Sequence, residues 1–232
     1  MRLDNFVASS SGLTRKEAKR AIQGGEVSVD GEPCQRAATQ IRGHEQVSLA
    51  GQLLHLPGER YYMLHKPAGV VSATEDREHA TVLSLFPAEL RPGLRIVGRL
   101  DRDTTGLLLL TTDGHWLHRA TSPRRQCPKI YQVTLPEPLA EKAIQQLESG
   151  LLLKGDDKPT RPAKVTVMDT HCIHLTLTEG RYHQVKRMLA AVGSHVETLH
   201  RVQVGDIVLD PALTPGAYRP LTAQEISQFA ED

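Results

Sequence analysis

The chain reads Gly98-Arg99-Leu100-Asp101-Arg102-Asp103-Thr104-Thr105-Gly106 and continues at once into Leu107-Leu108-Leu109-Leu110-Thr111. The second segment is a continuous apolar run of strand length, so we predict a buried strand there. A loop rich in carboxylate, guanidinium and hydroxyl groups is therefore fixed against the core. Two interpretations are open. The loop is either an ordinary charged turn in which Asp101 pairs with Arg99, or a site that holds one carboxylate ionised and oriented.

The composition sets limits on the function. The 232 residues carry 28 Lys and Arg against 27 Asp and Glu, so a nucleic-acid-binding role would have to rest on local basic patches. Three widely separated cysteines favour neither a disulfide framework nor a cysteine zinc site, and they suit a reducing cytosol. The first residues lack an apolar signal core, and no apolar run is long enough to span a bilayer. We therefore expect a cytoplasmic protein with no membrane partner.

Residues 1–56 are predicted to form a small unit of their own. Thr14-Arg15-Lys16-Glu17 has the form of a capping box, so we expect a helix to begin there and to end before Gly24-Gly25. This helix would carry a basic face, which is either a solvated surface or a surface that contacts phosphates. Its members are Arg15, Lys16, Lys19 and Arg20. Residues 57–60 are predicted to be a linker.

Residues 61–232 are predicted to form one larger domain. Its expected strands alternate with irregularly placed helices, which favours an α+β fold with a mixed, mostly antiparallel sheet. We find neither a dinucleotide-binding glycine pattern nor a phosphate-binding loop, so we expect no nucleotide cofactor.

Two further basic segments follow the charged loop. Residues 114–136 contain no acidic residue, and a helix expected after Glu179-Gly180 carries several cations in its first turns. Either segment could meet phosphates, or could simply be a charged outer face. The cations of the first segment are Arg119, Arg124, Arg125 and Lys129, and the basic residues of the second are Arg181, His183, Lys186 and Arg187.

Several motifs together resemble the pseudouridine synthases of the RsuA type, over essentially the full length of the chain. Residues 1–56 resemble an S4 RNA-binding domain. The family's catalytic motif is matched by Gly98-Arg99-Leu100-Asp101 with Thr104-Thr105-Gly106, its tyrosine motif by Lys129-Ile130-Tyr131, and its third motif by residues 179–188. Tyr182 and His183 favour the branch that modifies small-subunit ribosomal RNA.

The resemblance implies that Asp101 is the nucleophile in the isomerisation of one uridine to pseudouridine. Lys186 would pair with Asp101 in a dry pocket and keep it ionised, and Tyr131 would stack on the displaced base or help to remove the C5 proton. Arg99 would hold the target nucleotide extruded, with Leu100, Thr104 and Thr105 in the same target loop. The implied substrate is 16S ribosomal RNA, at uridine 516, as naked RNA or in an assembling 30S particle. No cofactor and no metal are implied, and we expect a monomer.

Other functions fit part of the sequence. An enzyme of the same family could act on 23S ribosomal RNA, and a non-catalytic ribosomal RNA-binding or assembly module would explain the basic patches without explaining the order of Asp101, Tyr131 and Lys186. A glycosidase would also use Asp101, but it needs a second, well-placed acid. The eleven histidines show no zinc-binding spacing.

Overall fold

The computed structural model describes residues 1–42, 45–55 and 58–230, and the chain divides into two compact units, Met1–Glu59 and Arg60–Asp232. The division falls inside the predicted linker 57–60, of which Pro57 lies outside the described residues. No helix in the described part of the chain is both long and apolar enough to cross a membrane.

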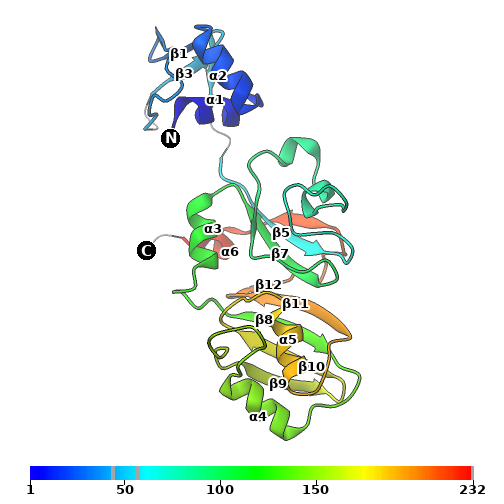
Figure 1. Cartoon of the computed structure of the whole chain (residues 1–232). Helices are drawn as coiled ribbons and strands as arrows, with labels where there is room; N and C mark the ends of the chain where they lie inside the picture. The colour runs from blue at the N-terminus through cyan, green and yellow to red at the C-terminus, as the bar shows by residue number, and fades with distance from the viewer. Residues whose placement is uncertain (43–44, 56–57, 231–232) are drawn as a thin grey trace. The chain divides into compact units, whose positions relative to one another are not determined.

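The first unit packs two helices on a small antiparallel sheet of order β2-β1-β3-β4 (Figure 1). The predicted capping box is present, because the Thr14 hydroxyl accepts from the Glu17 amide while the Glu17 carboxylate accepts from the Thr14 amide. The apolar residues of both helices form a core with Val27 and Val47. The elements are α1 Leu3–Ser11, α2 Arg15–Gln23, β1 Val27–Val29, β2 Glu32–Pro33, β3 Val47–Leu49 and β4 Gln52–Leu54.

The second unit is built on a nine-stranded sheet of order β13-β5-β7-β11-β8-β10-β9, with β6 paired to β7 and β12 to β11. Among the described strands, only β7 and β11 pair in parallel. This is the mixed, mostly antiparallel sheet that the sequence predicted. Its strands are β5 Tyr61–Lys66, β6 Arg95–Val97, β7 Thr105–Thr111, β8 Lys129–Thr134, β9 Lys164–Asp169, β10 Cys172–Leu177, β11 Thr198–Val204, β12 Ile207–Val208 and β13 Tyr218–Pro220.

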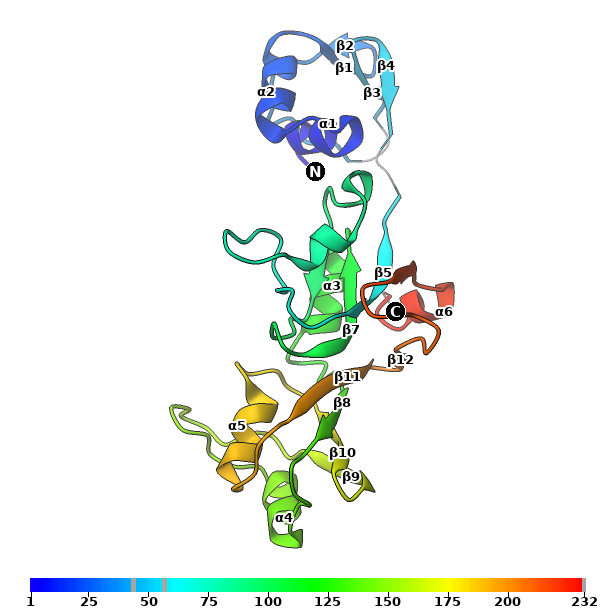
Figure 2. The same cartoon turned by 90° about the vertical axis from the view of Figure 1, so that its right-hand side faces the viewer.

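The helices of this unit cover different parts of the sheet (Figures 1 and 2). Helices α4 and α5 pack on the half formed by β8 and β10, through Leu147, Met188 and Leu189. Helix α3 packs on the β5–β7 half through Trp116, which contacts Phe229 just beyond α6. The helices are α3 Gly114–Thr121, α4 Glu141–Ser149, α5 Gln184–Ala191 and α6 Ala223–Ser227, with 3-10 turns at η1 Val82–Leu85 and η2 Ala88–Leu90.

One local expectation needs correction. The helix expected after Gly180 begins only at Gln184, because His183 has a φ of 46° and interrupts the helical backbone. Arg181 and His183 therefore lie in the turn before α5.

The two halves of the large sheet meet along a short seam. Strands β7 and β11 share only two paired positions, Thr105 with His200 and Gly106 with Arg201. Gly106 has a φ of 104°, and a Cβ atom built on it would lie 2.3 Å from the Arg201 carbonyl oxygen. Only glycine allows the two backbones to approach this closely.

We expect Gly106→Ala to destabilise the protein by on the order of 4 kcal/mol or more, because a backbone overlap adds to the strain of a positive φ. Gly155→Ala is a matched control: Gly155 has a φ of 85°, with open space around its Cβ position. It should cost only about 1–2 kcal/mol of backbone strain. Urea unfolding of both variants checks this, and equal losses would show that the close approach does not matter.

Candidate active site

The charged loop lies against a transverse row of residues on one face of the large sheet. Lys66 pairs with Gly106, Gly106 with Arg201, and Arg201 with Tyr131, across four neighbouring strands. Residues paired in this way point to the same face of a sheet. Tyr131 packs against the cores of both halves of the sheet, so the row crosses the junction between the two halves.

Lys66 is a fully buried cation beneath the loop. Its Nζ atom donates to three carbonyl oxygens, those of Thr104 at 2.7 Å, Pro67 at 3.0 Å and Arg102 at 3.2 Å. Burial lowers the pKa of Lys66 to about 8, against the opposing attraction of Asp103 and Asp101. An ammonium group has three donors, and here each of them has an acceptor.

Arg201 holds both ends of the loop and is only 1% exposed. Its Nε atom donates to the Leu107 carbonyl at 2.9 Å, and its Nη2 atom donates to the Gly98 carbonyl at 3.1 Å. Within the described residues it forms no ion pair with a carboxylate. A buried guanidinium without a carboxylate places uncompensated positive charge beneath the loop.

The target-loop residues Leu100, Thr104 and Thr105 are held by contacts within the protein. Leu100 is buried in the core, and Ser72 both accepts from its amide and donates to its carbonyl. Thr104 is 1% exposed. The Thr105 hydroxyl is 2.8 Å from His200 Nδ1, and Thr105 alternates with Gly106, so it points to the opposite face of the sheet. In this structure the three side chains support the loop, and their contact with a substrate stays a prediction.

The Asp101 carboxylate is 29% exposed and faces two basic side chains. Lys186 Nζ lies 3.3 Å from Asp101 Oδ2, and His183 Nε2 lies 3.5 Å from Oδ1. Lys186 thus stands beside Asp101, as the resemblance implied. His183, which we expected to contact RNA, also stands there. The expected dry pocket is not found, because the carboxylate is partly open to solvent.

Lys186 is shared between two carboxylates. It donates to both oxygens of Asp103, at 2.7 and 2.9 Å, which is closer than its approach to Asp101. These hydrogen bonds lower the pKa of Asp103. Burial acts to lower the pKa of Lys186, but its bonds to Asp103 and Asp101 outweigh burial and raise it. The ammonium group is therefore charged at neutral pH.

Arg99 and Tyr131 are the other two residues to which the resemblance assigned a role in the reaction. Arg99 is exposed and forms no ion pair within the described residues, so the simple charged turn with an Asp101–Arg99 pair is not what the structure contains. Tyr131 is half-buried on β8 and lies in the same row as Arg201.

Six of the predicted RNA-binding cations are exposed. Four of them lie on α2, and two lie in the turn after α3. The residues are Arg15, Lys16, Lys19, Arg20, Arg124 and Arg125.

Two other predicted RNA-binding cations are engaged within the protein. Arg119 donates to the Phe229 carbonyl and Lys129 to that of Cys127, and burial lowers the pKa of Lys129. These contacts reduce what the two side chains can offer to phosphates. Arg15 lies 3.6 Å from Asp4, but its side chain is largely exposed.

Arg181 and Arg187 converge on one carboxylate, that of Asp156. Both guanidinium groups also donate to backbone carbonyls of the 154–159 loop. In this arrangement they fasten the start of α5, and their contact with RNA stays a prediction.

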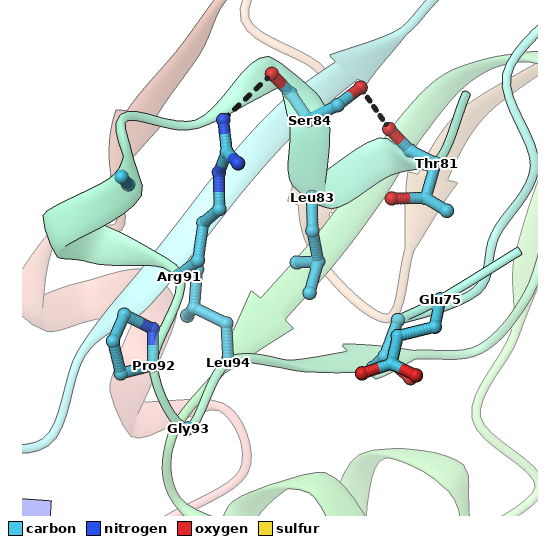
Figure 3. Close-up of a pocket in the computed structure, with 10 residues that line it drawn as sticks. Glu75, Thr81, Leu83, Ser84, Arg91, Pro92, Gly93 and Leu94 are labelled. Carbon is cyan, nitrogen blue, oxygen red and sulfur yellow. Dashed lines mark hydrogen bonds between the residues drawn. The ribbon is translucent and has the colours of Figure 1, made fainter. Parts of the chain in front are cut away.

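A cavity of about 500 Å³ lies elsewhere, over the 3-10 turns (Figure 3). Its wall includes Glu75, Thr81, Ser84 and Arg91, and it contains no residue of the charged loop. Nor does the described part of the chain gather three His, Cys, Asp or Glu side chains that could hold a metal ion.

The sequence analysis missed Lys66, Ser72 and Arg201. Lys66 ends an apolar strand, where a lysine normally marks the return to solvent. Arg201 lies in a strand of alternating character, where a charged residue predicts an exposed position. The one available signal was Gly106. A glycine at this position indicates that another backbone segment approaches closely, but it does not indicate which residue that segment contains.

Comparison with known proteins agrees with the motifs. Residues 60–191 match the model of the RNA pseudouridylate synthase family, and residues 1–47 match that of the S4 domain. The chain is 45% identical over 232 residues to the ribosomal small subunit pseudouridine synthase A of Haemophilus influenzae, covering 100% of both chains. It is 47% identical over 228 residues to the protein of the same name from Escherichia coli, covering 98% of this chain and 99% of that one.

A solved structure supports the same conclusion. The crystal structure of a pseudouridylate synthase matches with a TM-score of 0.73 and 44% identity, covering 99% of this chain and 100% of that chain. The chain therefore belongs to the RNA pseudouridylate synthase family and carries an N-terminal S4 domain.

Proposed function

We propose that this enzyme converts uridine 516 of 16S ribosomal RNA to pseudouridine, with Asp101 as the nucleophile. The observation that carries the proposal is the Asp101 carboxylate beside Lys186, at 3.3 Å, on a loop whose backbone is held by two buried cations. The names of the two curated relatives support a substrate in the small ribosomal subunit. We place the activity in the cytoplasm, where such RNA is made and assembled.

The reaction is an isomerisation. The bond between C1′ and N1 of the uridine breaks, a bond between C1′ and C5 forms, and the C5 proton is lost while N1 gains one. An ionised carboxylate can capture the electron-poor C1′ or drive elimination within the sugar, and both routes start from charged Asp101. Lys186 Nζ, 3.3 Å from the carboxylate, places a positive charge beside it.

The partly open site makes the RNA itself part of the active site. Asp101 is 29% exposed, so a bound nucleotide has to cover it and displace water from it. The uridine must leave its stack to reach the carboxylate, which costs a few kcal/mol. Arg99, exposed beside Asp101 in the chain, is suited to hold the extruded nucleotide, and Tyr131 to contact its base.

Binding energy for this extrusion has to come from elsewhere on the protein. The S4 domain presents Lys16, Lys19 and Arg20 on one helix, and the turn after α3 presents Arg124 and Arg125. We assign both surfaces to phosphates of the folded RNA, which is recognised mainly through its shape and backbone.

We expect Asp101→Asn to lower the conversion rate by on the order of 10⁴-fold or more, because the amide cannot act as the nucleophile. Asp103→Asn is the matched control, since it removes a carboxylate that contacts the same lysine. It should convert uridine within about tenfold of the wild type, because Lys186 can then turn fully to Asp101.

Pseudouridine mapping by chemical labelling and primer extension on 16S and 23S RNA, naked and in assembling particles, is the measurement. Conversion at a 23S position would correct the substrate, and RNA binding by the wild type without any conversion would favour a binding module. If Asp103→Asn were inactive and Asp101→Asn active, the assignment of the nucleophile would be wrong.

We expect activity to fall as the pH rises through about 8, the pKa of the buried Lys66. Deprotonation removes one of the three N–H donors with which its Nζ atom holds the loop. Lys66→Met removes all three, so its conversion rate should be low at every pH and lack this alkaline decline. Single-turnover rates from pH 6.5 to 9.5 check both expectations. A decline of the same shape in the variant would assign it to another group.

Global stability should change in the opposite direction. The folded-state pKa of Lys66, about 8, lies below the ordinary value of 10.5. The unfolded chain therefore binds more protons between these two values, and the contribution of Lys66 to the free energy of unfolding rises with pH across that interval. Urea unfolding of the wild type and Lys66→Met at pH 8 and 10 measures this difference. Activity that falls while this contribution rises identifies a local effect on the loop.

A further inference from the structure

Tyr182 is a large aromatic side chain held out in solvent beside the active site. It is 77% exposed, the highest value among the exposed large apolar side chains of the described residues. Its ring stacks on that of His183, with a centroid separation of 3.8 Å and an interplanar angle of 18°. One face of the tyrosine ring is covered by this contact, so its exposure belongs to the other face and the edge.

The stack stands next to the nucleophile. His183 Nε2 lies 3.5 Å from Asp101 Oδ1, so the histidine ring on which Tyr182 stacks is the one that faces the carboxylate. The target uridine has to reach Asp101 itself. The open face of Tyr182, on the far side of the histidine ring, is therefore available to a different base.

The turn that carries the stack is fastened from several directions. Arg187 Nη1 donates to the Tyr182 carbonyl at 3.2 Å, and the same guanidinium is bound to Asp156. The Arg181 amide donates to Gln184 Oε1 at 2.8 Å. With a φ of 46°, His183 holds a left-handed backbone conformation that is uncommon outside glycine.

We propose that the open face of Tyr182 is a stacking site for an unpaired nucleobase adjacent to the target uridine. The inference rests on the proposed function. When one nucleotide leaves a stack, its neighbour loses a stacking partner, which is part of the cost of extrusion. A rigid, exposed aromatic ring beside the site replaces that partner, and it does so for any base because every base has a π face.

The test is a double-mutant cycle on the full chain with an RNA substrate that contains the target loop. Tyr182→Ala removes the ring, and Tyr182→Phe keeps it as the matched control. The RNA is made intact, or with an abasic residue at the position on the 5′ or the 3′ side of the target. RNA affinity and kcat/KM are measured for every combination, with thermal unfolding to confirm that each variant is folded.

On intact RNA, Tyr182→Ala should weaken affinity and lower kcat/KM by on the order of 10- to 100-fold, while Tyr182→Phe stays within about twofold of the wild type. One of the two abasic RNAs should cause a similar loss with the wild type and little further loss with Tyr182→Ala, because the two changes remove the same contact. If Tyr182 had only a structural role, the loss caused by Tyr182→Ala would not become smaller on the abasic RNA.

Two results would overturn the proposal: a Tyr182→Ala variant that matches the wild type in both affinity and kcat/KM, or losses from the protein and RNA changes that simply multiply. Failure of the proposed function has a different signature, in which the wild type binds the RNA and converts no uridine. The affinity arm of the cycle still decides the stacking proposal in that case.

Discussion

The approach of Gly106 to the backbone of Arg201 is the constraint on which the rest of the catalytic domain depends. It joins the two halves of the sheet through two paired positions only, and it brings the Arg201 guanidinium beneath the charged loop. Lys66 reaches the same loop from the neighbouring strand. Removing this close approach would therefore disturb both the joint between the two halves and the support of the loop.

The loop is held in place because several of its backbone groups are hydrogen-bonded to buried side chains. The carbonyls of Gly98, Arg102 and Thr104 accept from buried cations. Ser72 satisfies both backbone groups of Leu100. The side chains left free to act are those that point outward, above all Asp101 and Arg99. A carboxylate fixed in this way needs little reorganisation during a reaction, which is where much of an enzyme's electrostatic advantage arises.

Much of this arrangement follows from the sequence, and the rest depends on long-range pairing. The capping box at Thr14 and the strand after Gly106 are local patterns, so they could be predicted. The roles of Lys66 and Arg201 could not be, because their acceptors lie far away in the chain and burying such cations contradicts the usual pattern. The burial of Leu100 and Thr104 could not be predicted either, because membership of a motif does not say which side of the loop a side chain occupies.

The seam also sets the order in which the enzyme can become active during synthesis. Asp101 belongs to the half of the sheet that leaves the ribosome first, whereas Lys186 and Arg201 belong to segments that leave it late. Domains tend to fold from the N-terminus as the chain emerges. An unfinished chain can therefore fold its S4 domain while its Asp101 carboxylate still lacks Lys186 and the charged loop still lacks the support of Arg201. The site is complete only after the last third of the chain has been added.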